Sequence, residues 1–175
     1  MITGSYGWTL ARVADKISGM FLEEKIVEAV ATREAERIAR ELYGVETRAT
    51  ALPGEYDCNF HLQARDGREF VLKCMHPARE TAFIDMQCAA PAHLLHHAAQ
   101  LPLPRVQPTS RGEAHTSWND AAGQARQVWM LNFLSGKTLA NTTPHSAELF
   151  YELGKFLGEM DSALASFEHP RHTEN

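Results

Sequence analysis

The chain has 175 residues, of which 44% are hydrophobic and 22% are charged, a composition typical of a folded globular domain. Its 17 Lys and Arg residues stand against 22 Asp and Glu residues, a formal net charge of −5, and no dense basic run is present. No apolar stretch approaches the roughly 18 to 20 residues that a membrane span requires. These features argue against partners such as nucleic acid or a membrane.

The cysteines and the N-terminus indicate the compartment. Cys58, Cys74 and Cys88 are odd in number and form no paired CxxC spacing. The first residues have no basic head followed by an apolar block, as a secretory signal peptide would. The sequence therefore predicts free thiols and a cytoplasmic protein rather than a small disulfide-stapled domain.

The N-terminal part is expected to contain an arm followed by a helix. Residues 1–22 have mixed polarity and no clear period. In residues 23–43, Ala31, Ala35, Ile38 and Leu42 recur at the spacing of one helix face. Gly44 follows where a left-handed residue commonly ends a helix. We therefore predict an arm, residues 1–22, and a helix that ends at residue 43.

Residues 46–75 are expected to form three antiparallel strands. The segments 46–52, 57–64 and 69–75 are β-compatible, and Pro53-Gly54 marks a turn between the first two. Asp66-Gly67 lies between the second and third segments, and Asp-Gly between alternating segments is a strong hairpin signal.

The remaining segments complete an α+β fold. A helix is expected over 80–100, with a kink or break at Pro91, and strands over 106–109 and 127–131 with a polar loop over 110–125 between them. Residues 132–139 are expected to be a connector. The last helix, over 144–167, carries an apolar stripe that predicts core packing. The sequence thus predicts about five mostly antiparallel strands with one crossing helix.

Lys73 is the first candidate functional residue, because a lysine that ends an apolar strand needs a partner for its ammonium. Asp85 on the following helix is one candidate partner and Glu80 is the other. A plain strand-end lysine that reaches solvent is the alternative. His93, His96 and His97 lie at helical spacing, but no third ligand and second shell accompany them, so a metal site is not predicted.

Several segments together resemble the aminoglycoside phosphotransferase family, which has a protein-kinase-like fold. The resemblance extends from about Ala35 to Pro170 and is closest to the hydroxylysine-kinase-like branch, some members of which are fused to a class-III aminotransferase. The segments that carry it are Leu52–Asn59, Phe70–Lys73, Phe83–Gln87, Leu101–Arg105, Met130–Leu139 and Leu153–Leu164.

The resemblance implies an ATP site. Lys73 would contact the α- and β-phosphates and Asp85 would orient it. A flap over the phosphates would consist of Gly54–Asn59, including Glu55 and Asp57, although these polar residues are also ordinary turn formers. A hinge against adenine would consist of Met130–Phe133, including Asn132. The implied reaction is transfer of the ATP γ-phosphate to a hydroxyl of an amino-alcohol or aminoglycoside-like substrate.

The sequence departs from the family at the catalytic loop. None of the nine histidines is followed two positions later by Asp, and no Asp is followed two positions later by Gly. We therefore expect no catalytic residues and no metal ligands here, and Mg²⁺ only in an intact two-lobed enzyme. The expected organisation is the arm, a nucleotide-binding lobe over 23–131, and a hinge with the first helix of an otherwise missing second lobe over 132–175.

On that expectation the chain alone does not catalyse, and the acceptor would bind through the missing lobe. Part of the last helix would then lack its usual cover, which favours a homodimer through that helix. The alternative function is a non-catalytic kinase-like binding module used for assembly.

Overall fold

The computed structural model describes residues 29–170. Within them the elements are, in order, α2 (Thr32–Tyr43), β1 (Thr47–Leu52), β2 (Cys58–Ala64), β3 (Glu69–Cys74), α3 (Thr81–His97), β4 (Val106–Gln107), β5 (His115–Asn119), β6 (Ala125–Asn132), the short 3-10 helix η2 (Leu139–Asn141) and α4 (Ala147–Leu164). The expected arm over 1–22 and the first part of the expected helix over 23–43 lie outside the described residues.

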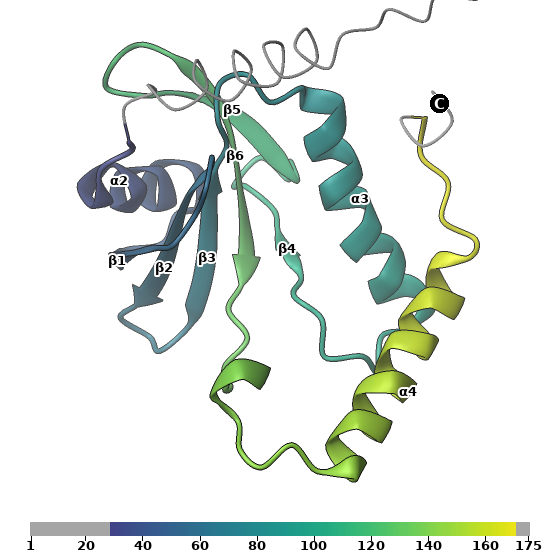
Figure 1. Ribbon diagram of the computed structural model, residues 1–175. Helices are drawn as coiled ribbons and strands as arrows, with labels where there is room; N and C mark the ends of the chain where they lie inside the picture. The colour runs from purple at the N-terminus through teal and green to yellow at the C-terminus, as the bar shows by residue number, and fades with distance from the viewer. Residues whose placement is uncertain (1–28, 171–175) are drawn as a thin grey trace, which may run out of the picture.

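The strands form one six-stranded antiparallel sheet in the order β1-β2-β3-β6-β4, with β5 paired to β6. Strand β6 pairs with β3 along one edge. Its other edge pairs with β4 near Leu131 and with β5 near Trp129. Helix α3 connects β3 to β4 across the sheet, as the sequence predicted (Figure 1). The α+β class is thus confirmed.

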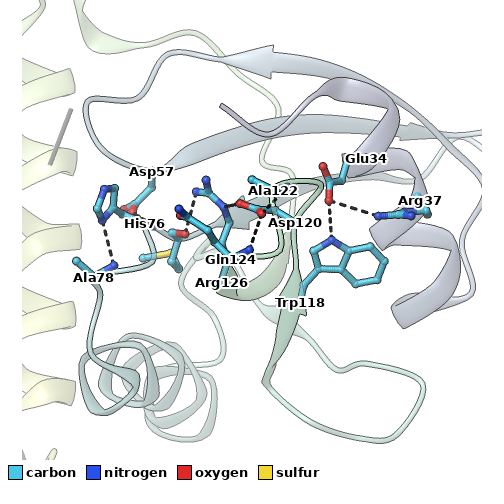
Figure 2. Close-up of polar contacts among 11 residues, drawn as sticks. Glu34, Arg37, Asp57, His76, Ala78, Trp118, Asp120, Ala122, Gln124 and Arg126 are labelled. Carbon is cyan, nitrogen blue, oxygen red and sulfur yellow. Dashed lines mark hydrogen bonds and ion pairs between the residues drawn. The ribbon is translucent and has the colours of Figure 1, made fainter. Parts of the chain in front are cut away.

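Strand β5 is the main difference from the predicted fold. It lies inside the segment 110–125, which was expected to be a loop, and raises the number of strands from about five to six. Its sequence, HTSWN, has one large apolar residue and hence no alternating apolar signal. Pairing with β6 makes it a strand, and the turn between them is closed by Asp120, whose Oδ1 accepts the N–H groups of Ala122 and Gln124 at 3.0 and 2.9 Å (Figure 2).

The two faces of the sheet carry separate apolar clusters. The face toward α2, here called the outer face, packs against the buried helix residues Ala35, Ile38 and Ala39. Its strand members are Phe60, Leu62, Phe70, Leu72, Cys74, Val128 and Met130. The opposite, inner face packs on α3, where Trp129 contacts the cluster that contains Ile84 and Cys88. Strand alternation therefore assigns neighbouring residues to opposite faces.

Helices α2 and α3 show where local sequence signals determined the structure and where they did not. Helix α2 ends at Gly44, which has φ 67° and donates its N–H to the Arg40 carbonyl at 3.1 Å. Helix α3, in contrast, continues unbroken through Pro91, where we expected a kink or a break. Residues on both sides of the proline are buried, with Cys88 4% and Leu94 7% exposed, so tertiary packing outweighs the single missing N–H donor.

The apolar stripe of helix α4 was expected to pack in a core, with part of the helix lacking its usual cover in this chain. None of its residues is buried, and Phe150, Tyr151 and Leu157 are exposed. The helix lies along the C-terminal part of α3 (Figure 1), where a ring nitrogen of His93 lies 2.9 Å from the carbonyl oxygen of Ala163. Within residues 29–170 no helix combines the length and the apolar character needed to cross a bilayer.

Candidate functional site

A transverse row of polar and aromatic side chains crosses the inner face. Register pairs join Asn59 on β2 to Lys73 on β3, Lys73 to Trp129 on β6, and Trp129 to His115 on β5. Directly paired residues project from the same face of an antiparallel sheet. The four side chains, of which Asn59 and Trp129 are 70 positions apart in the sequence, therefore lie side by side.

Lys73 is half-buried in this row, and its ammonium faces an aromatic ring. The Nζ atom lies 5.5 Å from the centre of the Trp129 ring, within the range of a cation–π contact. Within the described part of the chain Lys73 forms no ion pair, so neither Asp85 nor Glu80 is its partner there. The ring of Trp129 is thus the contact that the described residues give this ammonium.

Asp85 has a different partner from the one that the family resemblance implied. Its Oδ1 lies 2.7 Å from Nε2 of His115, and Nδ1 of that histidine lies 2.9 Å from Oε1 of Gln127. In the register His115 and Lys73 flank Trp129 on opposite sides. Because β5 was not predicted, His115 was not foreseen as a partner.

Polar contacts join the flap over residues 54–59 to the segment that follows β3. A carboxylate oxygen of Asp57 accepts the backbone N–H of His76 at 2.8 Å (Figure 2). The same oxygen faces Nε of Arg79 at 3.5 Å. Asp57 therefore holds the β1–β2 flap to the connection between β3 and α3. The guanidinium of Arg79 also lies 5.7 Å from the ring centre of Tyr56, which belongs to the flap.

The other flap residues have distinct surroundings. At Gly54 a Cβ would collide with the Asp57 carbonyl oxygen and would lie 2.9 Å from Nδ2 of Asn59, so only glycine fits there without a shift. Glu55 is exposed. The Oδ1 atom of Asn59 is buried and has no hydrogen-bond partner among the described residues. A buried acceptor without a partner beside Lys73 fits a site that takes a hydrogen-bond donor or a cation.

The expected hinge divides between the two faces. Met130 is 2% exposed and packs in the outer cluster, away from Lys73, whereas Leu131 belongs with the inner one. The backbone N–H groups of Asn132 and Phe133 are used within the sheet, by the carbonyls of Arg105 at 3.1 Å and Glu69 at 2.9 Å. These two N–H groups are therefore already engaged by the protein backbone.

Beyond the predicted residues, two side chains line the inner face near the hinge. The His61 ring lies 4.3 Å from the Phe133 ring, centre to centre, and His61 is the register partner of Val71. Sequence reasoning missed His61 and Val71 as site residues, whereas Phe133 was predicted as part of the hinge. The alternation of side chains along each strand was the available signal. Val71, two positions before Lys73, and His61, two positions after Asn59, lie on the same face as Lys73 and Asn59.

The described residues contain no group of three His, Cys, Asp or Glu side chains that could hold a metal ion. The rings of His93 and His97 stack at 4.2 Å instead. Cys58 and Cys74 are register partners on β2 and β3 and remain free thiols.

Comparison with known proteins defines the class of fold. No family model matches the chain. Amicoumacin kinase, solved in complex with AMP-PNP, Ca²⁺ and Ami, superposes with a TM-score of 0.64 and 18% identity over 89% of this chain and 44% of that one. A microcompartment-associated aminopropanol kinase superposes with a TM-score of 0.61 and 14% identity over 83% of this chain and 44% of that one. The fold is therefore that of kinase-like phosphotransferases.

The particular relative agrees with the motifs found in the sequence. Hydroxylysine kinase from Danio rerio is 31% identical over 139 residues, which make up 76% of this chain and 38% of that protein. The resemblance to kinase-like phosphotransferases, on the side of hydroxylysine kinase, is thus confirmed. The chain spans less than half the length of this relative and of both solved kinases.

Proposed function

We propose that this chain forms the ATP-binding part of a small-molecule kinase. The observation that supports this most directly is the inner face, where Lys73 lies beside the buried, unsatisfied Oδ1 of Asn59 and makes no ion pair within residues 29–170. The Lys73 ammonium, under a glycine-containing flap, is suited to the oxygens of a nucleotide phosphate chain. The Asn59 Oδ1 is an acceptor, so it can take a hydrogen bond only from a donor that accompanies those oxygens, such as the ammonium itself or a water.

In this proposal each part of the inner face has a role. Lys73 contacts the α- and β-phosphates of ATP, and the flap over residues 54–59 excludes water above them. Val71, Leu131 and the ring of Phe133 offer apolar surface to adenine. A divalent cation would neutralise the phosphates in the two-lobed enzyme, and the described residues contribute no set of ligands for it.

The proposed reaction is transfer of the ATP γ-phosphate to a hydroxyl of an amino-alcohol or aminoglycoside-like acceptor. Similarity to hydroxylysine kinase supports the amino-alcohol class. We assign ATP binding to the lobe over 23–131 and the connection to a second lobe to residues 132–175. Because the sequence holds no His-x-Asp catalytic motif, the proposal assigns no catalytic base to this chain.

The experiment is a thermal-unfolding titration with Mg·ATP. At about one hundred times the dissociation constant, ATP should raise the free energy of unfolding by roughly 2.7 kcal/mol. Lys73→Ala should abolish most of this gain, whereas Lys155→Ala, on the exposed surface of α4, should retain it. If ATP shifts neither the parent nor the Lys155→Ala control, ATP binding by this chain is disproved.

A non-catalytic interaction module remains the second candidate, because the exposed side chains Phe150, Tyr151 and Leu157 of α4 offer an apolar surface. A homodimer through that helix would support it, and sedimentation of the parent beside Tyr151→Glu measures this.

We also propose a reducing, cytoplasmic location, because Cys58 and Cys74 are adjacent across two strands and yet unbonded.

A further inference from the structure

We infer that Trp129, rather than a helix carboxylate, positions the ammonium of Lys73, and that Asp85 instead anchors helix α3 to strand β5 through His115. This inference rests on the proposed function in so far as Lys73 is the residue that receives the phosphates. Trp129 is thereby a positioning residue.

The Trp129 ring is held in place by its neighbours. Its residue is 5% exposed, and its Nε1–H donates to Sδ of Met75 at 3.2 Å. The ring also packs in the inner cluster with Ile84 and Cys88 of α3. A ring fixed at its edge and covered by α3 offers a constant face to its register partner, Lys73, whose Nζ lies 5.5 Å from the ring centre.

Asp85 already has a partner in His115. Its carboxylate lies 2.7 Å from a ring nitrogen of His115, a residue whose side chain is only 14% exposed. Gln127 holds the other ring nitrogen at 2.9 Å, so both nitrogens of the imidazole are engaged. To reach Lys73, Asp85 would have to leave this partner and pass Trp129, since His115 and Lys73 lie on either side of that ring in the register.

The partner of Lys73 determines the charge that a nucleotide meets. A carboxylate paired with Lys73 would offset its positive charge, whereas an indole face orients the ammonium and leaves the charge uncompensated. The site would therefore favour the charged phosphate chain strongly over the uncharged nucleoside. The ratio of ATP to adenosine affinity reports this role, because general damage to the fold would weaken both ligands alike.

The experiment compares ATP and adenosine binding by calorimetry in the parent, Trp129→Phe, Trp129→Leu, Asp85→Asn and Lys73→Ala, each shown to be folded by circular dichroism. Trp129→Leu should weaken ATP binding roughly two- to fivefold, as expected for loss of a cation–π contact, with little change for adenosine. Trp129→Phe keeps an aromatic face and should restore most of the affinity. Asp85→Asn should lower the melting temperature and change the two ligands equally.

The inference is overturned if Asp85→Asn weakens ATP selectively, as Lys73→Ala does, while Trp129→Leu does not. A second measurement needs no nucleotide: in the ligand-free protein, the NMR signals of the Lys73 ε-methylene should carry a ring-current shift. That shift should vanish in Trp129→Leu and persist in Asp85→Asn. If the parent binds neither ligand, the proposed function fails, and the ring-current comparison alone decides the inference.

Discussion

Replacing Asp120 by Asn tests how far a single buried ion pair holds the β5–β6 hairpin together. Asp120 Oδ2 lies 2.7 Å from Nε of Arg126, and the two side chains are 5% and 2% exposed (Figure 2). Asn keeps an oxygen for the N–H groups of Ala122 and Gln124 but removes the negative charge. Removing one partner of a buried ion pair costs about 3–5 kcal/mol, so we expect a loss of that size in the free energy of unfolding.

Asp66→Asn is the matched control, since Asp66 and Arg68 also form an Asp–Arg pair at 2.7 Å in a hairpin turn. There the side chains are 54% and 60% exposed, so water screens the pair and the change should be small. The assay is urea unfolding. With a slope of about 2 kcal/mol per molar, Asp120→Asn should lower the midpoint by roughly 1.5–2.5 M. Equal midpoints for the two variants would refute the reasoning.

The same pair predicts a pH dependence. Burial raises the pKa of Asp120, but hydrogen bonds from the Arg126 guanidinium and from the Gln124 and Ala122 amides outweigh it and lower the pKa below its ordinary value. A lowered pKa means that the stabilisation is complete above the unfolded-state pKa, near 4, and is lost as the pH falls through the folded-state pKa. The difference in stability between the parent and Asp120→Asn should therefore shrink in acid and stay constant from about pH 5 upward.

Two further predictions concern the flap and the thiols. Gly54→Ala should shift the flap, because its Cβ overlaps a backbone carbonyl, and we expect a loss of about 1–3 kcal/mol in unfolding free energy with weaker Mg·ATP binding; an unchanged melting temperature would contradict this. Burial raises the pKa of the Cys88 thiol to about 12 and also raises that of Cys74. A thiol reagent at pH 8 should therefore modify neither residue before unfolding, and rapid labelling of either in the native protein would show that the site is open.

The elements that could be predicted from sequence are those whose signals are local. Gly44 ends α2 because a left-handed residue is needed there, and Asp66-Gly67 forms the β2–β3 turn. The apolar alternation along β3 assigns Leu72 and Lys73 to opposite faces without any knowledge of the partner strands. The position of Lys73 at the end of that strand, and hence the candidate site, follows from the same pattern.

Contacts between distant segments were decided by the tertiary structure. His115 lies on a polar strand that has no signal of its own and forms only because β6 offers an edge. On that strand a ring nitrogen of His115 lies 2.7 Å from the Asp85 carboxylate. Asp85 therefore pairs with His115 and not with Lys73, although Asp85 and Lys73 are only twelve residues apart in the sequence. Local periodicity constrains which way a side chain points, but the identity of its partner depends on the register of strands that pair later in the chain.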